Sequence, residues 1–141
     1  GLLGGYAYAE AMKAAVANHQ VGAESDFGAG KIYALQAGVS ATTWPVIERI
    51  GQVLAPLGIA LDKIGGSPGP DIGPMVKNGV PWAELAQDGT DYFDYHHTAN
   101  DTLDKINAKD LDQQVAAYAV LAYLAAETDV DFGPKPPEAK H

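Results

Sequence analysis

Helical and strand-like segments alternate along this chain, and that alternation constrains its fold more than any other feature of the sequence. The spacing of apolar residues predicts helices over Gly5–Asn18, Thr43–Leu57, Asp71–Asn78 and Asn107–Glu127. Strands are predicted over Val21–Asp26, Ile59–Ile64 and Pro81–Ala86, while Ile32–Val39 is either a strand or an irregular apolar segment. Alternation through short connections is typical of an α/β fold, with helices layered on a mostly parallel sheet of three or four strands.

Two of the predicted helices carry boundary signals. Thr43 is a candidate cap, and Pro45 suits a first helical turn. The apolar stripe of this helix consists of Val46, Ile47, Ile50, Val53, Leu54 and Leu57. Asn107 with acidic Asp110 predicts the start of the last helix. Its apolar stripe is Leu111, Val115, Tyr118, Ala122 and Ala125.

The composition excludes several classes of function. With 47% apolar and 19% charged residues, the 141-residue chain has enough apolar surface for one buried core. Its net charge of −9 repels phosphate backbones, which disfavours nucleic acid as a partner. The absence of cysteine rules out thiolate metal sites and cysteine nucleophiles. No apolar run approaches about 18 residues, so no membrane span is expected.

Side chains that could bind a ligand or act in catalysis follow the carboxyl ends of the predicted strands, where ligands bind in α/β sheets. Asp26, in Glu24-Ser25-Asp26-Phe27-Gly28, either points into a cleft as a ligand or acid/base, or caps its own loop. The breaker-rich loop that ends at Asp71 is either functional or a surface connection with a helix cap.

The segment from Asp88 to Thr102 contains four Asp, two His and three aromatic residues. Imidazole beside carboxylate is typical of a metal site, and the alternative is a polar loop with stacked aromatic rings. The Asp spacing does not fit an EF-hand calcium loop. Neither Ser25 nor Ser67 has the Gly-x-Ser-x-Gly context of a serine hydrolase.

Taken together, these segments resemble the co-catalytic di-zinc exopeptidases, most closely the plasma glutamate carboxypeptidase (carboxypeptidase Q-like) group. The matching segments fall in the family's order at Gly4–Glu10, Glu24–Gly28, Gly66–Asp71, Asn78–Pro81 and Tyr95–Thr102. The most specific signal combines Glu-Ser-Asp-x-Gly at 24–28 with His-Thr-x-x-Asp-Thr at 97–102. The resemblance implies the second half of a zinc-exopeptidase (phosphorylase/hydrolase-like) α/β fold.

By this resemblance the cofactor is zinc, as two ions about 3.5 Å apart in the intact enzyme. Asp26 would ligate one ion and His97 the other, while Asp101 would orient the site through hydrogen bonds. His96 would contact the oxyanion of the reacting peptide. Tyr95 and Asp71 would lie at the rim of the substrate pocket.

The resemblance also implies that the general-base Glu, the bridging Asp and the other ligands precede Gly1. We therefore expect residues 1–127 to form the C-terminal half of the catalytic domain and residues 128–141 a loose Pro-rich tail. A missing N-terminal half or a second chain is expected to cover the sheet.

The intact protein is expected to hydrolyse small peptides as a zinc exopeptidase, and the isolated chain to bind zinc weakly and to be inactive. An extracytoplasmic location is expected from the resemblance, although no signal peptide is recognised in the sequence. The alternative is a non-catalytic α/β binding or assembly domain that keeps the peptidase scaffold.

Overall fold

A mixed β-sheet forms the centre of the molecule. The computed structural model describes residues 2–133, and within them the sheet has three strands in the order β2-β1-β3. β1 (Ile32–Gly38) pairs in parallel with β2 (Ala60–Leu61) and antiparallel with β3 (Trp82–Gln87). The predicted α/β fold class is confirmed, but the longer of the two pairings is antiparallel rather than parallel.

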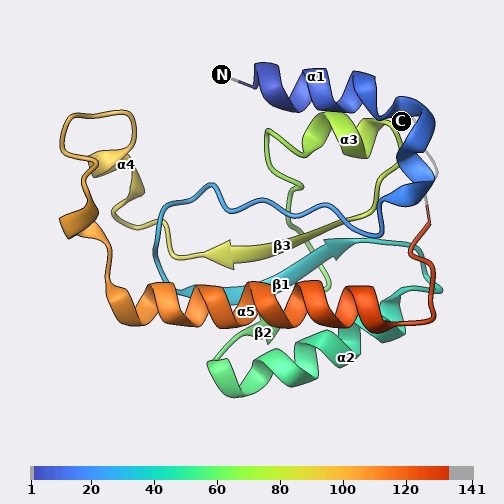
Figure 1. Cartoon of the computed structure of the whole chain (residues 1–141). Helices are drawn as coiled ribbons and strands as arrows, with labels where there is room; N and C mark the ends of the chain where they lie inside the picture. The colour runs from blue at the N-terminus through green and yellow to red at the C-terminus, as the bar shows by residue number, and fades with distance from the viewer. Residues whose placement is uncertain (1, 134–141) are drawn as a thin grey trace.

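One face of the sheet is covered by α2 (Trp44–Leu54) and α5 (Ala108–Glu127), which lie side by side (Figure 1). The main core fills the space between these helices and the strands. It consists of Ile32, Leu35, Val39, Ile47, Ile50, Leu54, Ile59, Ala83, Leu85, Ala117, Leu121, Ala125 and Phe132. A single 3-10 turn, η2 (Ala55–Leu57), continues α2 and ends at Gly58, whose φ of 79° stops the helix.

A second, smaller core lies between α1 (Leu3–Ala11) and α3 (Gly73–Lys77), away from α2 and α5 (Figure 1). The continuous helix predicted over Gly5–Asn18 is wrong, because the chain kinks after α1 and continues as the 3-10 helix η1 (Lys13–Asn18). Ala9 is the one buried residue of α1, and it packs against Met75 and Val80.

Two predicted strands are much shorter in the structure. The segment predicted over Val21–Asp26 pairs through a single parallel bridge between Gly22 and Trp82, and β2 is the two-residue remainder of Ile59–Ile64. Because the Gly22 segment runs parallel to β3, the chain leaves this bridge and the end of β3 at the same end of the sheet. The loops that carry Asp26 and His97 therefore begin near each other.

The predicted helix caps had different outcomes. Asn107 caps α5 as predicted, since its Oδ1 accepts from the backbone N–H of Lys109 at 2.9 Å. Thr43 precedes α2, but its hydroxyl pairs with Ser40 at 2.9 Å instead. Asp71 is not the cap of α3, which begins two residues later and has Ile72 at its cap position.

The end of the described chain packs on the core. Phe132 is 2% exposed, and its N–H donates to Gln20 Oε1 at 3.3 Å, so ordered packing extends beyond residue 127. Residues 134–141 of the predicted loose tail lie outside the described residues. Among residues 2–133, no helix is both long enough and apolar enough to span a bilayer.

Candidate functional site

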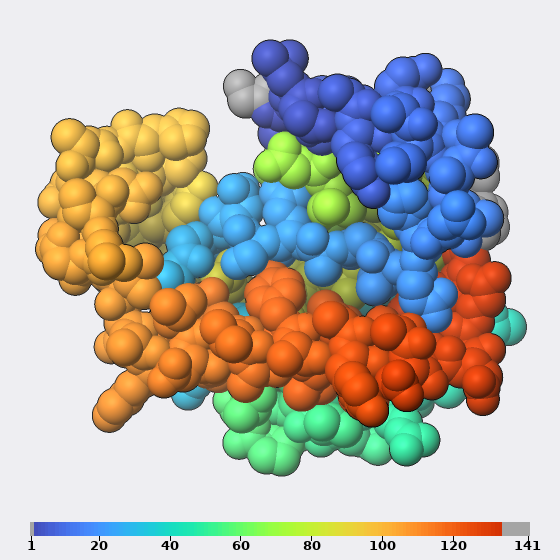
Figure 2. Space-filling view, in the orientation of Figure 1, coloured from blue at the N-terminus to red at the C-terminus, as the bar shows by residue number. Residues whose placement is uncertain are grey.

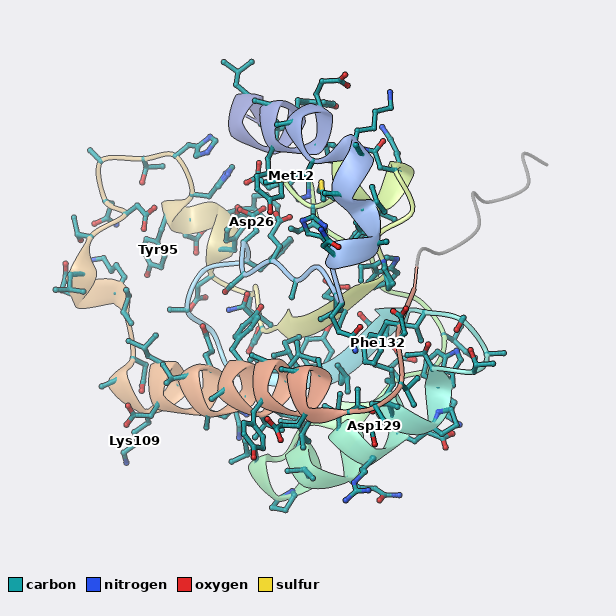
Figure 3. The ribbon with its side chains drawn as sticks, turned by 45° about the vertical axis from the view of Figure 1, so that its right-hand side comes forward. Met12, Asp26, Tyr95, Lys109, Asp129 and Phe132 are labelled. Atoms are coloured by element: carbon teal, nitrogen blue, oxygen red, sulfur yellow. The ribbon has the colours of Figure 1, made fainter. Side chains whose placement is uncertain are left out.

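The loop that carries Asp26 is fixed by hydrogen bonds on both sides of that residue. The Tyr118 hydroxyl, from α5, donates to the carbonyl of Glu24 at 2.7 Å. The Gln87 side chain, at the end of β3, donates to the carbonyl of Gly28 at 2.9 Å. Asp26 is exposed between these anchors and lies near the segment that carries Tyr95 (Figure 3). Its carboxylate is therefore available to a ligand on a backbone that is held in place.

The loop that carries His97 follows β3 and is built from successive turns. It contains α4 (Tyr92–Tyr95) and η3 (Leu103–Lys105), and it forms a projecting lobe in Figure 2. Thr98 organises its centre, because the hydroxyl donates to the Tyr95 carbonyl at 2.7 Å and accepts from the Asn100 N–H at 3.2 Å. The ammonium of Lys105 lies 5.9 Å from the centre of the Tyr95 ring, a cation–π contact.

His97 has an unusual backbone conformation. Its φ of 57° is in the left-handed region, which residues other than glycine seldom adopt. Such a conformation costs about 1–3 kcal/mol and is concentrated at ligand and active sites. The side chain of His97 is exposed.

Aromatic rings connect the two loops. Phe27 stacks on Tyr92 with ring centres 4.6 Å apart, and Tyr92 stacks on His96, also at 4.6 Å. His96 in turn stacks on His97 at 3.7 Å. Burial raises the pKa of the Tyr92 hydroxyl, and the charges of Asp26 and Asp101 raise that pKa further, which places both carboxylates in the neighbourhood of this ring.

The breaker-rich loop is attached to the same region by Glu24. Glu24 Oε2 accepts the backbone N–H groups of Asp71 at 2.9 Å and Ile72 at 3.0 Å. A pocket of about 330 Å³ is lined by Glu24, Asp26 and the loop from Gly66 to Pro70, among others. Asp71 itself lines a different pocket, together with His19 and Met75.

The donor types at this site suit zinc, although the described chain offers few of them. Carboxylate oxygen and imidazole nitrogen are ordinary zinc ligands, and Asp26 and His97 are both exposed on anchored loops. Within residues 2–133, no three His, Asp or Glu side chains are close enough together to hold a metal ion. Asp26 and His97 therefore fit a zinc site only as part of a larger ligand set.

Several residues that shape the site were not identified from the sequence. Tyr92 stands four residues before His96, so the two rings share one face of a helical turn, and that spacing was the available signal for Tyr92. Glu24 stands two positions from Asp26, yet nothing in its local sequence points to a contact with Asp71, 47 residues away. Gln87 and Tyr118 act through long-range contacts of the same kind.

No family model matches the chain. Over 129 residues it is 30% identical to carboxypeptidase Q of Homo sapiens and of Pongo abelii, a match that spans 92% of this chain and 27% of those proteins.

Among solved structures, the fold matches the crystal structure of a peptidase M28 precursor from Shewanella amazonensis SB2B. The TM-score is 0.90 and the identity 50%, over 98% of this chain and 31% of that one. This chain thus spans about a quarter of the length of the curated relatives it matches, and it corresponds to their C-terminal part.

Proposed function

We propose that this chain, which is similar to carboxypeptidase Q and to an M28 peptidase precursor, supplies part of the active site of a zinc-dependent exopeptidase acting on small peptides. One observation carries the proposal within the structure. The loops of Asp26 and His97, 71 residues apart in sequence (97 − 26 = 71), are joined by stacked rings at one end of the sheet. Candidate ligands for a metal pair are expected to converge in this way.

The roles of the individual residues follow their chemistry. Asp26 and His97 would each hold one zinc ion, which when bound would act as a Lewis acid and lower the pKa of water for attack on the peptide carbonyl. Asp101, near Tyr92, would orient the His97 loop. The His96 ring nitrogen would donate a hydrogen bond to the developing oxyanion. Tyr95 would border the substrate.

The remaining ligands and the general base would come from polypeptide outside this sequence. The length of the matched relatives supports this, as does the small donor set of residues 2–133. The same polypeptide, or a second chain, would cover the apolar residues that α1 leaves exposed, among them Leu3 at 82% and Tyr6 at 55%. We place the whole protein outside the cytoplasm by analogy with the carboxypeptidase Q-like group.

The test is a dipeptide hydrolysis assay on the longer peptidase that contains this chain, with zinc added and then removed by a chelator. We expect zinc-dependent turnover, and its loss in His97→Ala and in Asp26→Ala. Asp112→Ala, which removes an exposed carboxylate from α5, is the matched control and should retain full activity. The 141-residue chain alone should be inactive, because loss of a general base alone costs roughly 10²–10⁴-fold.

Two results would contradict this proposal. Zinc-dependent hydrolysis by the 141-residue chain alone would mean that other residues within it complete the site. A longer protein that neither binds zinc nor hydrolyses any dipeptide would favour the alternative, a binding or assembly domain that keeps the peptidase scaffold.

A further inference from the structure

We propose that Tyr92 is a positioning residue of the metal site, whose ring holds the Asp26 loop and the His97 loop in register with each other. The inference rests on the proposed function, because it concerns the same two candidate ligands. It assigns to Tyr92 a role that does not require contact with metal or substrate. What carries it is the place of this ring in the series Phe27–Tyr92–His96–His97.

Tyr92 is the one ring of the series that contacts both loops by stacking. Its plane lies 20° from that of Phe27 and 29° from that of His96, with ring centres 4.6 Å away in each case. Phe93 packs edge-to-face against Tyr92, with ring centres 5.0 Å apart and an interplanar angle of 81°. Offset-stacked and edge-to-face pairs of this kind are the favoured geometries of aromatic rings. Both faces of the Tyr92 ring are therefore occupied.

The backbone around the rings leaves space for this arrangement. A Cβ atom on Gly89, just after β3, would lie 2.4 Å from Phe27 Cδ1, so only glycine permits the observed position of the Phe27 ring. Gly28 has a φ of 78°, which turns the chain immediately after Phe27, and a Cβ there would contact the Tyr92 ring at 3.6 Å. Two glycines thus adapt the two loops to the stack.

The stack ends on the candidate ligand itself. His96 lies between Tyr92 and His97, and its ring is 3.7 Å from that of His97 with an interplanar angle of 22°. Because the His97 imidazole stacks on the packed His96 ring, it samples fewer orientations than a free side chain would. Partners that orient a metal ligand through hydrogen bonds change metal affinity about 10–100-fold when they are removed, and we expect a stacked ring to act on the same scale.

The experiment compares two substitutions of Tyr92 in the longer peptidase. Tyr92→Leu removes the ring, whereas Tyr92→Phe keeps the ring and removes only the hydroxyl. Zinc affinity is measured by competition with a chelator, and we expect about 10-fold or greater loss in Tyr92→Leu with wild-type affinity in Tyr92→Phe. Tyr123→Leu removes an exposed ring from α5 and serves as the matched control.

A second measurement reads the stack directly in the 141-residue chain. The Cε1 proton of His96 experiences the ring current of Tyr92, so its NMR shift should change in Tyr92→Leu and persist in Tyr92→Phe. If Tyr92→Leu fails to fold, Phe27→Leu removes the stack from its other end and should weaken zinc binding in the same way.

The outcomes separate this inference from the proposed function. If His97→Ala abolishes zinc binding while Tyr92→Leu and Phe27→Leu bind zinc as wild type does, the positioning role is wrong and the metal site stands. If Tyr92→Phe loses as much affinity as Tyr92→Leu, the hydroxyl is responsible and the inference is overturned. If His97→Ala leaves zinc affinity unchanged, the proposed function itself fails.

Discussion

At the scale of one residue, Glu24 shows that the fold uses a carboxylate to which the Glu-Ser-Asp-x-Gly motif gave no role. Its Oε2 accepts the two backbone N–H groups just before α3, while Oε1 is buried without a hydrogen-bond partner among the described residues. Burial raises the pKa of this carboxyl, the two N–H groups oppose that shift, and the nearby charges of Asp26 and Asp71 add to it. Glu24 thus links the Asp26 loop to the breaker-rich loop and is sensitive to pH.

The raised pKa of Glu24 predicts a pH dependence of stability with a definite sign. Between the ordinary glutamate pKa of about 4.3 and the higher folded value, the folded protein binds more protons than the unfolded chain. The free energy of unfolding should therefore decrease as the pH rises through this window, and Glu24→Gln should remove that decrease. Urea denaturation at a series of pH values measures it, with Glu127→Gln as an exposed control. Identical pH profiles for Glu24→Gln and wild type would contradict the assignment.

Gly69 tests the same contact from the loop side. Its φ is 85°, and a Cβ there would lie 2.4 Å from Glu24 Oε2. Gly69→Ala should destabilise the fold by roughly 1–3 kcal/mol, through left-handed strain and through displacement of the carboxylate. Gly73→Ala is the matched control, since no atom lies within 4 Å of its added Cβ and Gly73 begins α3. Thermal unfolding of the two variants should differ clearly, and equal melting temperatures would argue against the tight Glu24 contact.

Single residues were predictable from the sequence when a short motif contained them. Asp26 and His97 are singled out by their local patterns, and their loops do begin at the same end of the sheet. That their donor atoms approach each other closely stays a prediction. Tyr92 and Glu24 were missed because their partners, Phe27 and the Asp71–Ile72 backbone, are 65 and 47 or 48 residues away (92 − 27 = 65). Such contacts exist only once the elements have packed.

At the scale of elements, α5 shows that a sequence pattern can predict a helix without predicting which of its faces is buried. Its cap and extent agree with the prediction, but its buried residues are Gln114, Ala117, Leu121 and Ala125, of which only Ala125 belongs to the predicted stripe. Of the predicted stripe, Val115 is 62% and Leu111 41% exposed. On the buried side of the helix, Gln113 donates to the carbonyl of Ile32 at the start of β1, and Gln114 donates to the carbonyl of Gly30, two residues before it, at 2.6 Å. A hydrophobicity pattern cannot anticipate a buried amide.

Gln114 therefore offers a test at the element scale. Gln114→Leu keeps the size and apolar character expected of a helix core position but removes the donor to the Gly30 carbonyl. We expect a loss of about 1–2 kcal/mol in the free energy of unfolding, because a half-buried acceptor is left without its partner. Val115→Thr, at the exposed neighbouring position, should change stability by no more than about 0.5 kcal/mol. Chemical denaturation distinguishes the two, and a Gln114→Leu variant as stable as wild type would refute the anchoring role.

The sheet shows a second limit of prediction at this scale. Alternating helices and strands predicted the α/β class correctly, because layering follows from which faces are apolar. The direction of β3 could not be predicted in this way. The connection from β2 to β3 passes through α3, away from α2 and α5, and β3 then runs antiparallel to β1. The Val21 segment has strand-like sequence but forms a single bridge to Trp82 within the described residues.

At the scale of the whole molecule, α1 is the element whose surroundings are least complete. A helix that is apolar on all sides is normally buried. In α1 only Ala9 is buried, and Leu3 and Tyr6 are 82% and 55% exposed. This helix occupies the top of the molecule in Figure 2, and its buried residue belongs to the smaller core. Exposed apolar surface of this kind is typical of an interface, and under the proposed function polypeptide outside this sequence would cover it.

The last prediction concerns this surface of α1. The isolated chain should associate as its concentration rises, and the double substitution Leu3→Glu with Tyr6→Glu should reduce that association while changing the free energy of unfolding by no more than about 0.5 kcal/mol per site. Ala119→Glu with Ala122→Glu adds the same two charges to exposed positions of α5 and is the matched control for net charge. Sedimentation velocity over a range of concentrations measures the difference. If, as proposed, further polypeptide covers α1, the same substitutions should destabilise that longer protein, because they would bury two carboxylates at the interface. A wild-type chain that stays monomeric at every concentration would contradict the prediction that the exposed surface of α1 is an interface.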